Sequence, residues 1–188
     1  MRFQYEERYG AAEIARRIQD IGRRISYDYP EGPIVLIAIL KGAGFFVADL
    51  ARAVSRPARC EYIDVIRKGD EEEITNINFI TSFDAPDANL IVLKDVTRSG
   101  VVETYLMNQL REHNPRSIRF AALVDRPQER KSSLLVDYVL FPSEEGVLVG
   151  YGMEYHGEGG NFPFIAQVRT EEGEAPFEAA GDQYARKG

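Results

Sequence analysis

Residues 34–54 read IVLIAILKGAGFFVADLARAV, and this stretch decides the fold class. Ile34–Leu40 is apolar at every position, which is typical of a strand buried on both faces of a parallel sheet. Lys41–Gly44 forms a glycine-containing turn, and Phe45–Val54 returns to the spacing of an amphipathic helix. A buried strand, a glycine turn and a helix make up half of a βαβ unit, so the stretch predicts an α/β fold.

Strand and helix patterns alternate along the rest of the chain. Turn residues bound the apolar segments, and segments of helical period lie between them. We therefore expect an α/β architecture with a mainly parallel sheet that is flanked by helices. The expected elements are helices at Ala11–Ile25 and Val101–His113, strands at Asn89–Leu93, Ser117–Val124 and Val136–Phe141, and a hairpin of Cys60–Ile66 with Ile74–Thr81.

The composition limits the functional classes. The chain has 188 residues and a net charge of -7, which disfavours binding to nucleic acid or to an anionic membrane through a basic face. One cysteine, Cys60, excludes a disulfide framework. The start, MRFQYEERYG, lacks an apolar signal region, and the longest apolar run is too short to span a bilayer. We expect a cytoplasmic protein with one domain over residues 1–170 and an acidic, loosely ordered tail over 171–188.

Two polar segments with glycine follow buried strands. Lys41–Gly44 follows the first strand, and Asp95–Gly100 follows Asn89–Leu93, a strand that we expect to end at Lys94. Ligands of open parallel sheets sit beyond the carboxyl ends of the strands, so both segments should face one cleft. The second segment also opens a helix and offers N–H groups, hydroxyls and a cation, which suit a phosphate. An ordinary Ser/Thr helix cap is the competing interpretation.

Four long segments carry a family resemblance: IVLIAILKGAGFFVADLARAV (34–54), NLIVLKDVTRSGVVETYL (89–106), FAALVDRPQERKSSLLVDYVLF (120–141) and GVLVGYGMEYHGEGGNFPFI (146–165). Together they resemble the hypoxanthine-guanine phosphoribosyltransferases, which are type I phosphoribosyltransferases. The resemblance runs from about Glu7 to Val168. It implies a flavodoxin-like sheet with a small hood, a homo-oligomer, and Mg²⁺-dependent transfer of ribose-5-phosphate from phosphoribosyl pyrophosphate to a nucleobase.

The resemblance also implies roles for single residues. Lys41-Gly42 matches a loop that binds pyrophosphate through backbone N–H groups, and Asp95 matches an acid that holds the ribose hydroxyls. Arg126 stands where a lysine reads the exocyclic oxygen of the purine, and Glu154 stands where an aspartate helps to hold Mg²⁺. The implied phosphate site is Lys41, Gly42, Asp95, Thr97, Arg98, Ser99, Gly100, Val101 and Val102; the implied base site is Arg126, Val147 and Leu148; the implied metal residue is Glu154.

Several site positions depart from the family pattern. Lys94 replaces the first ribose acid, and Val102 replaces a threonine that binds the 5′-phosphate. Arg98 replaces the acid credited with receiving the purine proton, and an arginine stays protonated at physiological pH, so no catalytic residue is assigned. Val147 replaces a stacking aromatic ring, which predicts a more open canopy, and Gly160 replaces an arginine that contacts pyrophosphate. The resemblance places a mobile lid between Val65 and Asn78, but this segment is shorter than the family's loop and strongly acidic.

Three functions remain open from the sequence. The chain is a purine phosphoribosyltransferase of nucleotide salvage with weakened or altered activity, a sensor that binds a nucleotide or sugar phosphate without turnover, or a partner subunit of a true transferase. At the second loop, Arg98 either holds or steers an anion, or it points into solvent or pairs with a neighbouring acid such as Glu103.

Overall fold

The computed structural model describes residues 3–67, 74–79, 86–142 and 146–169. The tail over 171–188 and most of the acidic turn that follows Arg67 lie outside the described residues. None of the described helices combines the length and apolar composition that crossing a membrane requires.

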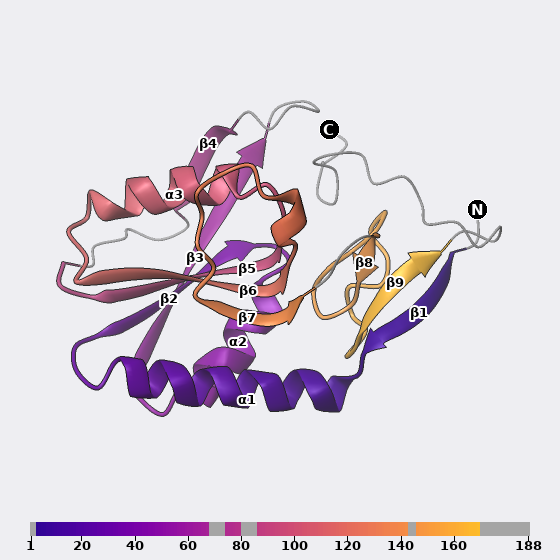
Figure 1. Cartoon of the computed structure of the whole chain (residues 1–188), viewed down its shortest axis with the longest axis horizontal. Helices are drawn as coiled ribbons and strands as arrows, with labels where there is room; N and C mark the ends of the chain where they lie inside the picture. Colours follow the sequence, from indigo (N-terminus) through magenta and orange to yellow (C-terminus); the bar gives the residue numbers. More distant parts are fainter. Residues whose placement is uncertain (1–2, 68–73, 80–85, 143–145, 170–188) are drawn as a thin grey trace.

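A sheet of six strands forms the centre of the molecule, in the order β4-β3-β2-β5-β6-β7 (Figure 1). Five strands are parallel, and β4 pairs antiparallel with β3, so the predicted hairpin is confirmed. The parallel strands follow the flavodoxin-like order, which confirms the predicted fold class. The strands are β2 (Ile34–Leu40), β3 (Ala58–Arg67), β4 (Ile74–Phe79), β5 (Asn89–Thr97), β6 (Ser117–Asp125) and β7 (Tyr138–Pro142).

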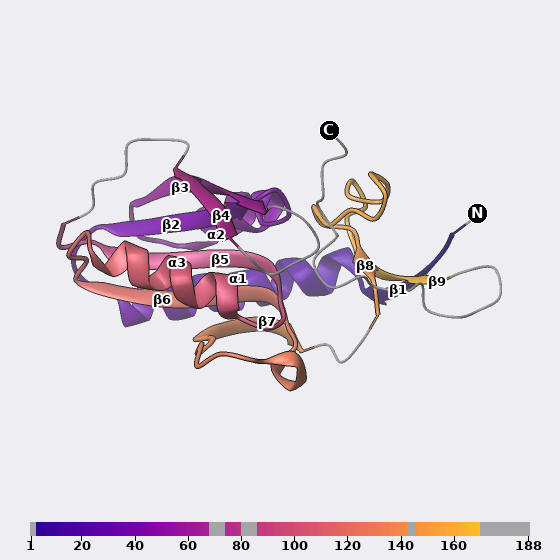
Figure 2. The ribbon, with the colours of Figure 1, turned by 90° about the horizontal axis from the view of Figure 1, so that it is seen from above.

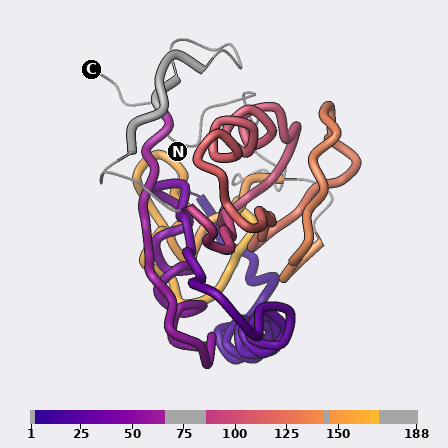
Figure 3. Tube along the Cα trace, turned by 90° about the vertical axis from the view of Figure 1, so that its left-hand side faces the viewer, coloured from indigo at the N-terminus to yellow at the C-terminus, as the bar shows by residue number. Residues whose placement is uncertain are grey.

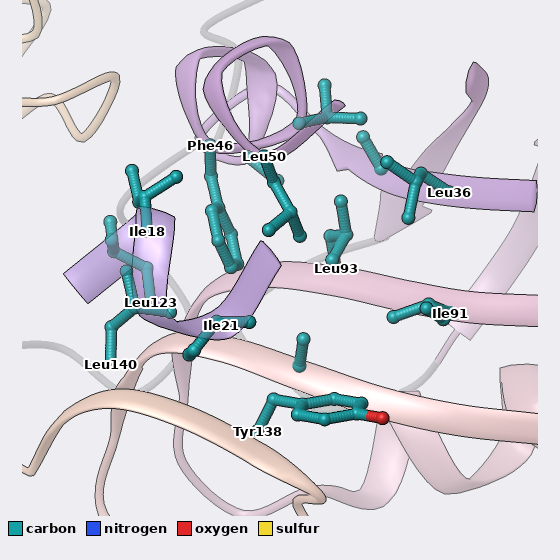
Figure 4. Close-up of a cluster of buried hydrophobic side chains, with 14 of the residues drawn as sticks. Ile18, Ile21, Leu36, Phe46, Leu50, Ile91, Leu93, Leu123, Tyr138 and Leu140 are labelled. Carbon is teal, nitrogen blue, oxygen red and sulfur yellow. The ribbon is translucent and has the colours of Figure 1, made fainter. Parts of the chain in front are cut away.

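Helices cover both faces of this sheet, as Figures 1 and 3 show. Helices α1 (Ala11–Asp28) and α2 (Gly44–Ala53) pack on one face, and α3 (Val101–Arg111) packs on the other. Strand β2 is apolar at every position because both of its faces are buried. Leu36 and Ala38 face α1 and α2, whereas Val35, Ile37 and Ile39 face α3. Figure 4 shows the first of these cores, in which α1 and α2 side chains meet residues from four strands.

A second, smaller sheet forms the hood. Its order is β1-β9-β8, all antiparallel, and it lies beside one end of the main sheet (Figure 2). Its apolar cluster is Val147, Val149, Ala166 and Val168, with aromatic side chains around it. The small hood that the resemblance implied is therefore present. Its strands are β1 (Gln4–Tyr9), β8 (Leu148–Val149) and β9 (Ile165–Arg169).

Several predicted boundaries differ from the observed ones. Helix α1 continues to Asp28 rather than ending at Ile25, and strand β7 begins at Tyr138 rather than at Val136. Helix α3 ends at Arg111 rather than His113. Strand β5 does not end at Lys94 but continues to Thr97, with all nine residues buried and with parallel pairing to β6 up to Asp125. A charged pair at the end of an apolar run normally signals a strand end. Here the two charges neutralise each other inside the sheet, so the strand can go on.

Candidate functional site

The strand order reverses between β2 and β5, and open α/β sheets bind ligands beyond the strand ends at such a switch point, here named the β2/β5 crevice. Strand β2 pairs with β3 on one side and with β5 on the other, both in parallel. The chain leaves β2 and β3 toward one side of the sheet and β5 and β6 toward the other, which is the arrangement at which open α/β sheets bind ligands. The segments after β2 and β5 lie at the same edge, as expected for Lys41–Gly44 and the stretch up to Val102.

The segment after β2 is shaped by its backbone. The peptide bond between Leu40 and Lys41 is cis, and the N–H of Gly44 donates to the Lys41 carbonyl over 3.0 Å. The hood comes close to this turn at Gly152, which has a φ of +96°. A Cβ atom on Gly152 would lie 2.7 Å from the carbonyl oxygen of Gly42. The hood therefore touches the predicted pyrophosphate loop through glycine backbone on both sides.

Tyr151 anchors the hood to α2. Its hydroxyl donates to the carboxylate of Asp49 on that helix, and its ring makes an edge contact with Phe45. Burial raises the pKa of Tyr151 well above its ordinary value, and the hydrogen bond to Asp49 raises it further. The neutral hydroxyl is thus kept as a donor, and the anchor holds Gly152 in place above Gly42.

The segment after β5 ends in a glycine cap. Gly100 has a φ of 73° and is the N-cap of α3 without a side-chain hydrogen bond, so the competing interpretation of a Ser/Thr N-cap is wrong. The Val101 N–H donates a long hydrogen bond of 3.4 Å to Ser99 Oγ. Thr97 Oγ1 is buried and has no hydrogen-bond partner among the residues described. The first turn of a helix presents free N–H groups, so this end of α3 remains suited to an anion.

Lys94 and Asp95 form a buried ion pair at the end of β5. The Lys94 Nζ lies 3.0 Å from Asp95 Oδ1, and the two side chains are 10% and 1% exposed. The residue expected to hold ribose hydroxyls is therefore already paired with the cation that replaced its neighbouring acid. A carboxylate can be buried when such a partner offsets the loss of its hydration.

A chain of polar contacts connects Arg98 of the predicted phosphate site with Arg126 of the predicted base site. Arg98 Nε donates to Glu129 Oε2 over 2.7 Å, and the other carboxylate oxygen lies 3.4 Å from Arg126 Nη1. The Arg126 side chain is buried, and its Nη2 donates to the carbonyl of Gly146. Arg98 thus pairs with an acid, as one alternative held, but the acid is Glu129. The suggested Glu103 is a buried residue of α3.

The loop after β6 lies against the phosphate segment. The Lys131 N–H donates to the Ser99 carbonyl over 2.9 Å, and Arg130 Nη1 donates to the Arg98 carbonyl over 2.8 Å. Arg130 also pairs with Asp125, the last residue of β6. This loop begins with a 3₁₀ turn, η1 (Pro127–Glu129). Glu129 is held in position because the residues on either side of the turn are hydrogen-bonded to the β5 side: the Arg126 N–H donates to the Thr97 carbonyl, and the Lys131 N–H donates to the Ser99 carbonyl.

The hood holds the remaining predicted residues. Val147 and Leu148 are buried, and Val147 packs in the hood cluster rather than facing an opening, so its contact with a base stays a prediction. Glu154 lies over Gly160, where an added Cβ would be 2.6 Å from Glu154 Cγ. The Val147 side chain has no exposed surface, and the open canopy over the base stays a prediction.

Sequence reasoning missed Glu129 as a site residue. The sequence did offer one signal, because acidic and basic residues alternate in DRPQER, residues 125–130, and Arg98 stands in another predicted site loop where an acid is expected. Spacing alone could not pair Arg98 with Glu129, because the two residues are 31 positions apart and belong to different loops.

Comparison with known proteins agrees with this arrangement. Residues 5–156 match the family described as a phosphoribosyl transferase domain. The hypoxanthine-guanine phosphoribosyltransferase of Mycobacterium tuberculosis is 32% identical over 154 residues, which cover 77% of this chain and 76% of that protein. The Bacillus subtilis enzyme of the same name is 27% identical over 164 residues, or 84% of this chain and 89% of that protein.

Solved structures lead to the same family. The crystal structure of a hypoxanthine-guanine phosphoribosyltransferase from Bacillus anthracis, with a HEPES molecule in its active site, superposes with a TM-score of 0.82. It is 26% identical in sequence, and the match covers 90% of this chain and all of that one. The fold, the two loops at the β2/β5 crevice and these relatives identify the chain as a divergent member of the hypoxanthine-guanine phosphoribosyltransferase family.

Proposed function

We propose that the protein transfers ribose-5-phosphate from phosphoribosyl pyrophosphate to a purine base, hypoxanthine or guanine, in nucleotide salvage. The observation that carries the proposal is the pair of loops at the β2/β5 crevice, with Lys41-Gly42 on one side and the glycine-capped start of α3 on the other. One loop offers backbone groups to pyrophosphate, and the other offers a helix N-terminus to the 5′-phosphate. Family membership supports the same reaction.

We expect this protein to bind the ribose of phosphoribosyl pyrophosphate differently from relatives that keep the family pattern. Asp95 is paired with Lys94, so this edge presents an ammonium group where two acids would otherwise bind the ribose diol. Val102, at 5% exposure, offers no hydroxyl to the phosphate. We therefore expect weaker binding of phosphoribosyl pyrophosphate than in relatives that keep both acids and the threonine.

Magnesium would be held mainly through the substrate. Among the described residues, no group of three or more His, Cys, Asp or Glu side chains converges on one point. Mg²⁺ is commonly bound by one or two carboxylates together with substrate phosphates, and Glu154 fits that requirement as a partly exposed hard donor. The bound ion would neutralise charge on the pyrophosphate oxygens.

A second candidate function rests on the same ion pairs. If the Lys94–Asp95 and Arg98–Glu129 pairs remain closed when a ligand binds, the protein is a sensor or partner subunit that recognises a nucleotide or sugar phosphate without turnover. The two functions differ in whether pyrophosphate is released, because both predict ligand binding at the β2/β5 crevice.

A pyrophosphate-release assay separates them. The purified full chain is incubated with phosphoribosyl pyrophosphate and Mg²⁺ and with hypoxanthine, guanine, xanthine or adenine, and thermal unfolding is followed in parallel. Release with a purine, abolished by EDTA, is the expected result. A rise in melting temperature with phosphoribosyl pyrophosphate or with inosine monophosphate, but without release, would favour the binding function instead.

A further inference from the structure

We propose that Glu129 is the catalytic proton acceptor of this site, in place of the acid that Arg98 replaced. This inference rests on the proposed transferase function and adds a residue to it. The geometry brings a carboxylate to the loop that lacks one, from a different segment of the chain.

Glu129 lies between the two residues that border the predicted base position. One carboxylate oxygen accepts a hydrogen bond from Arg98 Nε over 2.7 Å, and the other lies 3.4 Å from Arg126 Nη1. Arg126 in turn holds the carbonyl of Gly146, directly before the hood residues assigned to the base. Two guanidinium groups from different loops therefore fix the position of this carboxylate.

Exposure separates Glu129 from Asp95 and Asp125, two described acids at the ends of β5 and β6. Asp95 is 1% exposed and paired with Lys94, and Asp125 is 11% exposed and paired with Arg130. Glu129 keeps 29% of its side chain exposed while both of its oxygens are held. It can thus meet a ligand that enters from solvent, which the two more deeply buried carboxylates cannot do.

The proton transfer is balanced without any further reagent. The bond between the purine N9 and the sugar C1′ forms while the bond between C1′ and the pyrophosphate oxygen breaks, and pyrophosphate leaves with that electron pair. The proton on the purine N7 passes to a Glu129 oxygen. Arg98 cannot accept it, because its guanidinium is always protonated. Its role here is to position Glu129.

The test begins with E129Q and a matched control. Glutamine keeps the size and one acceptor oxygen for Arg98 but is a far weaker proton acceptor. We expect kcat for hypoxanthine to fall about 100-fold or more, within the usual range for loss of a general base, with the KM for phosphoribosyl pyrophosphate unchanged. The control is E13Q on α1, since Glu13 is also a partly exposed carboxylate paired with an arginine, Arg17. E13Q should keep wild-type kcat.

Two double variants separate proton transfer from simple charge balance. R98Q/E129Q removes both charges, so a site that needs only neutrality would recover, and we expect it to stay as slow as E129Q. R98D/E129Q differs from it only by a carboxylate at position 98, and we expect it to recover at least about tenfold in kcat. Melting temperatures of all variants verify that they are folded.

The outcomes distinguish the two proposals. Wild-type kcat in E129Q or in R98Q/E129Q, or equal rates in the two double variants, would overturn the role of Glu129 and leave the transferase function standing. If the wild-type chain releases no pyrophosphate with any purine, the proposed function fails, and the role of Glu129 fails with it.

Discussion

The segments after β2 and β5 border the same crevice but keep the family pattern to different extents. Lys41-Gly42 is retained, and its surroundings are backbone groups, with Gly152 placed against the Gly42 carbonyl. On the β5 side, Lys94 within the strand and Arg98 directly after it stand where the resemblance implies acids, and each has a carboxylate partner in the folded chain. One side of the site is defined by backbone shape, and the other by paired charges.

This difference suggests which changes a site of this kind tolerates. A backbone contact between two glycines leaves no room for any side chain, so such positions cannot vary independently. A charged side chain can be exchanged for one of opposite sign when another residue supplies the counter-charge. The following predictions test this contrast, from the largest expected effect to the smallest.

Replacing Lys94 should have the largest effect on stability. K94M leaves the Asp95 carboxylate buried without its ammonium partner, and breaking a buried pair typically costs about 3–5 kcal/mol. Urea unfolding of K94M against wild type measures this. The double variant K94M/D95N removes both charges and should regain most of the loss. Equal stability of K94M and wild type would show that the β5 side does not depend on paired charge.

Replacing Gly152 tests the backbone side. In G152A the new Cβ would meet the Gly42 carbonyl at 2.7 Å, and the φ of +96° adds strain of about 1–3 kcal/mol. We expect lower stability and weaker binding of phosphoribosyl pyrophosphate by calorimetry. G44A is the matched control for stability, because a Cβ on Gly44 would meet nothing within 4 Å. Wild-type binding by G152A would contradict the proposed contact between hood and loop.

Enlarging Val147 tests whether the hood position faces the base. The side chain is fully buried in the hood cluster, so V147F should overpack it and cost about 1–3 kcal/mol, without tightening purine binding. Thermal unfolding and a purine-binding titration measure the two effects. Tighter purine binding with unchanged stability would instead place the ring over a base, as the resemblance implies.

The smallest effect is expected at Tyr151. Y151F removes the hydrogen bond to Asp49, which we expect to cost about 1 kcal/mol at pH 8 because Asp49 is partly exposed and also pairs with Arg52. The pKa of Tyr151 is raised in the folded protein, so its contribution is present below its ordinary pKa of 10.0 and is lost as the pH rises above it.

The difference between Y151F and wild type should therefore shrink by about 0.8 kcal/mol at pH 10.5. Urea unfolding at pH 8 and pH 10.5 measures it. A difference that stays constant or grows between these two pH values would show that burial does not hold Tyr151 neutral.

The sequence by itself determined the elements whose signal is local. The apolar run of β2 and the helical spacing of α1 predicted a doubly covered parallel sheet, because burial on both faces requires such residues within one short segment. The order of these elements also predicted the edge at which the two loops meet. Four segments, 34–54, 89–106, 120–141 and 146–165, together indicated the family.

Only the tertiary structure decided how the substituted charges are paired. Strand β5 continues through Lys94 and Asp95 because the two neutralise each other in the sheet, which no propensity of either residue predicts. Glu129 meets Arg98 because β5 and β6 are parallel neighbours that end at the same edge. The hood strand β1 has a polar sequence and is mostly exposed, and it forms a strand because it pairs with β9 from the other end of the described chain. These features depend on which distant segments lie side by side, and that is settled by packing of the whole chain rather than by local sequence.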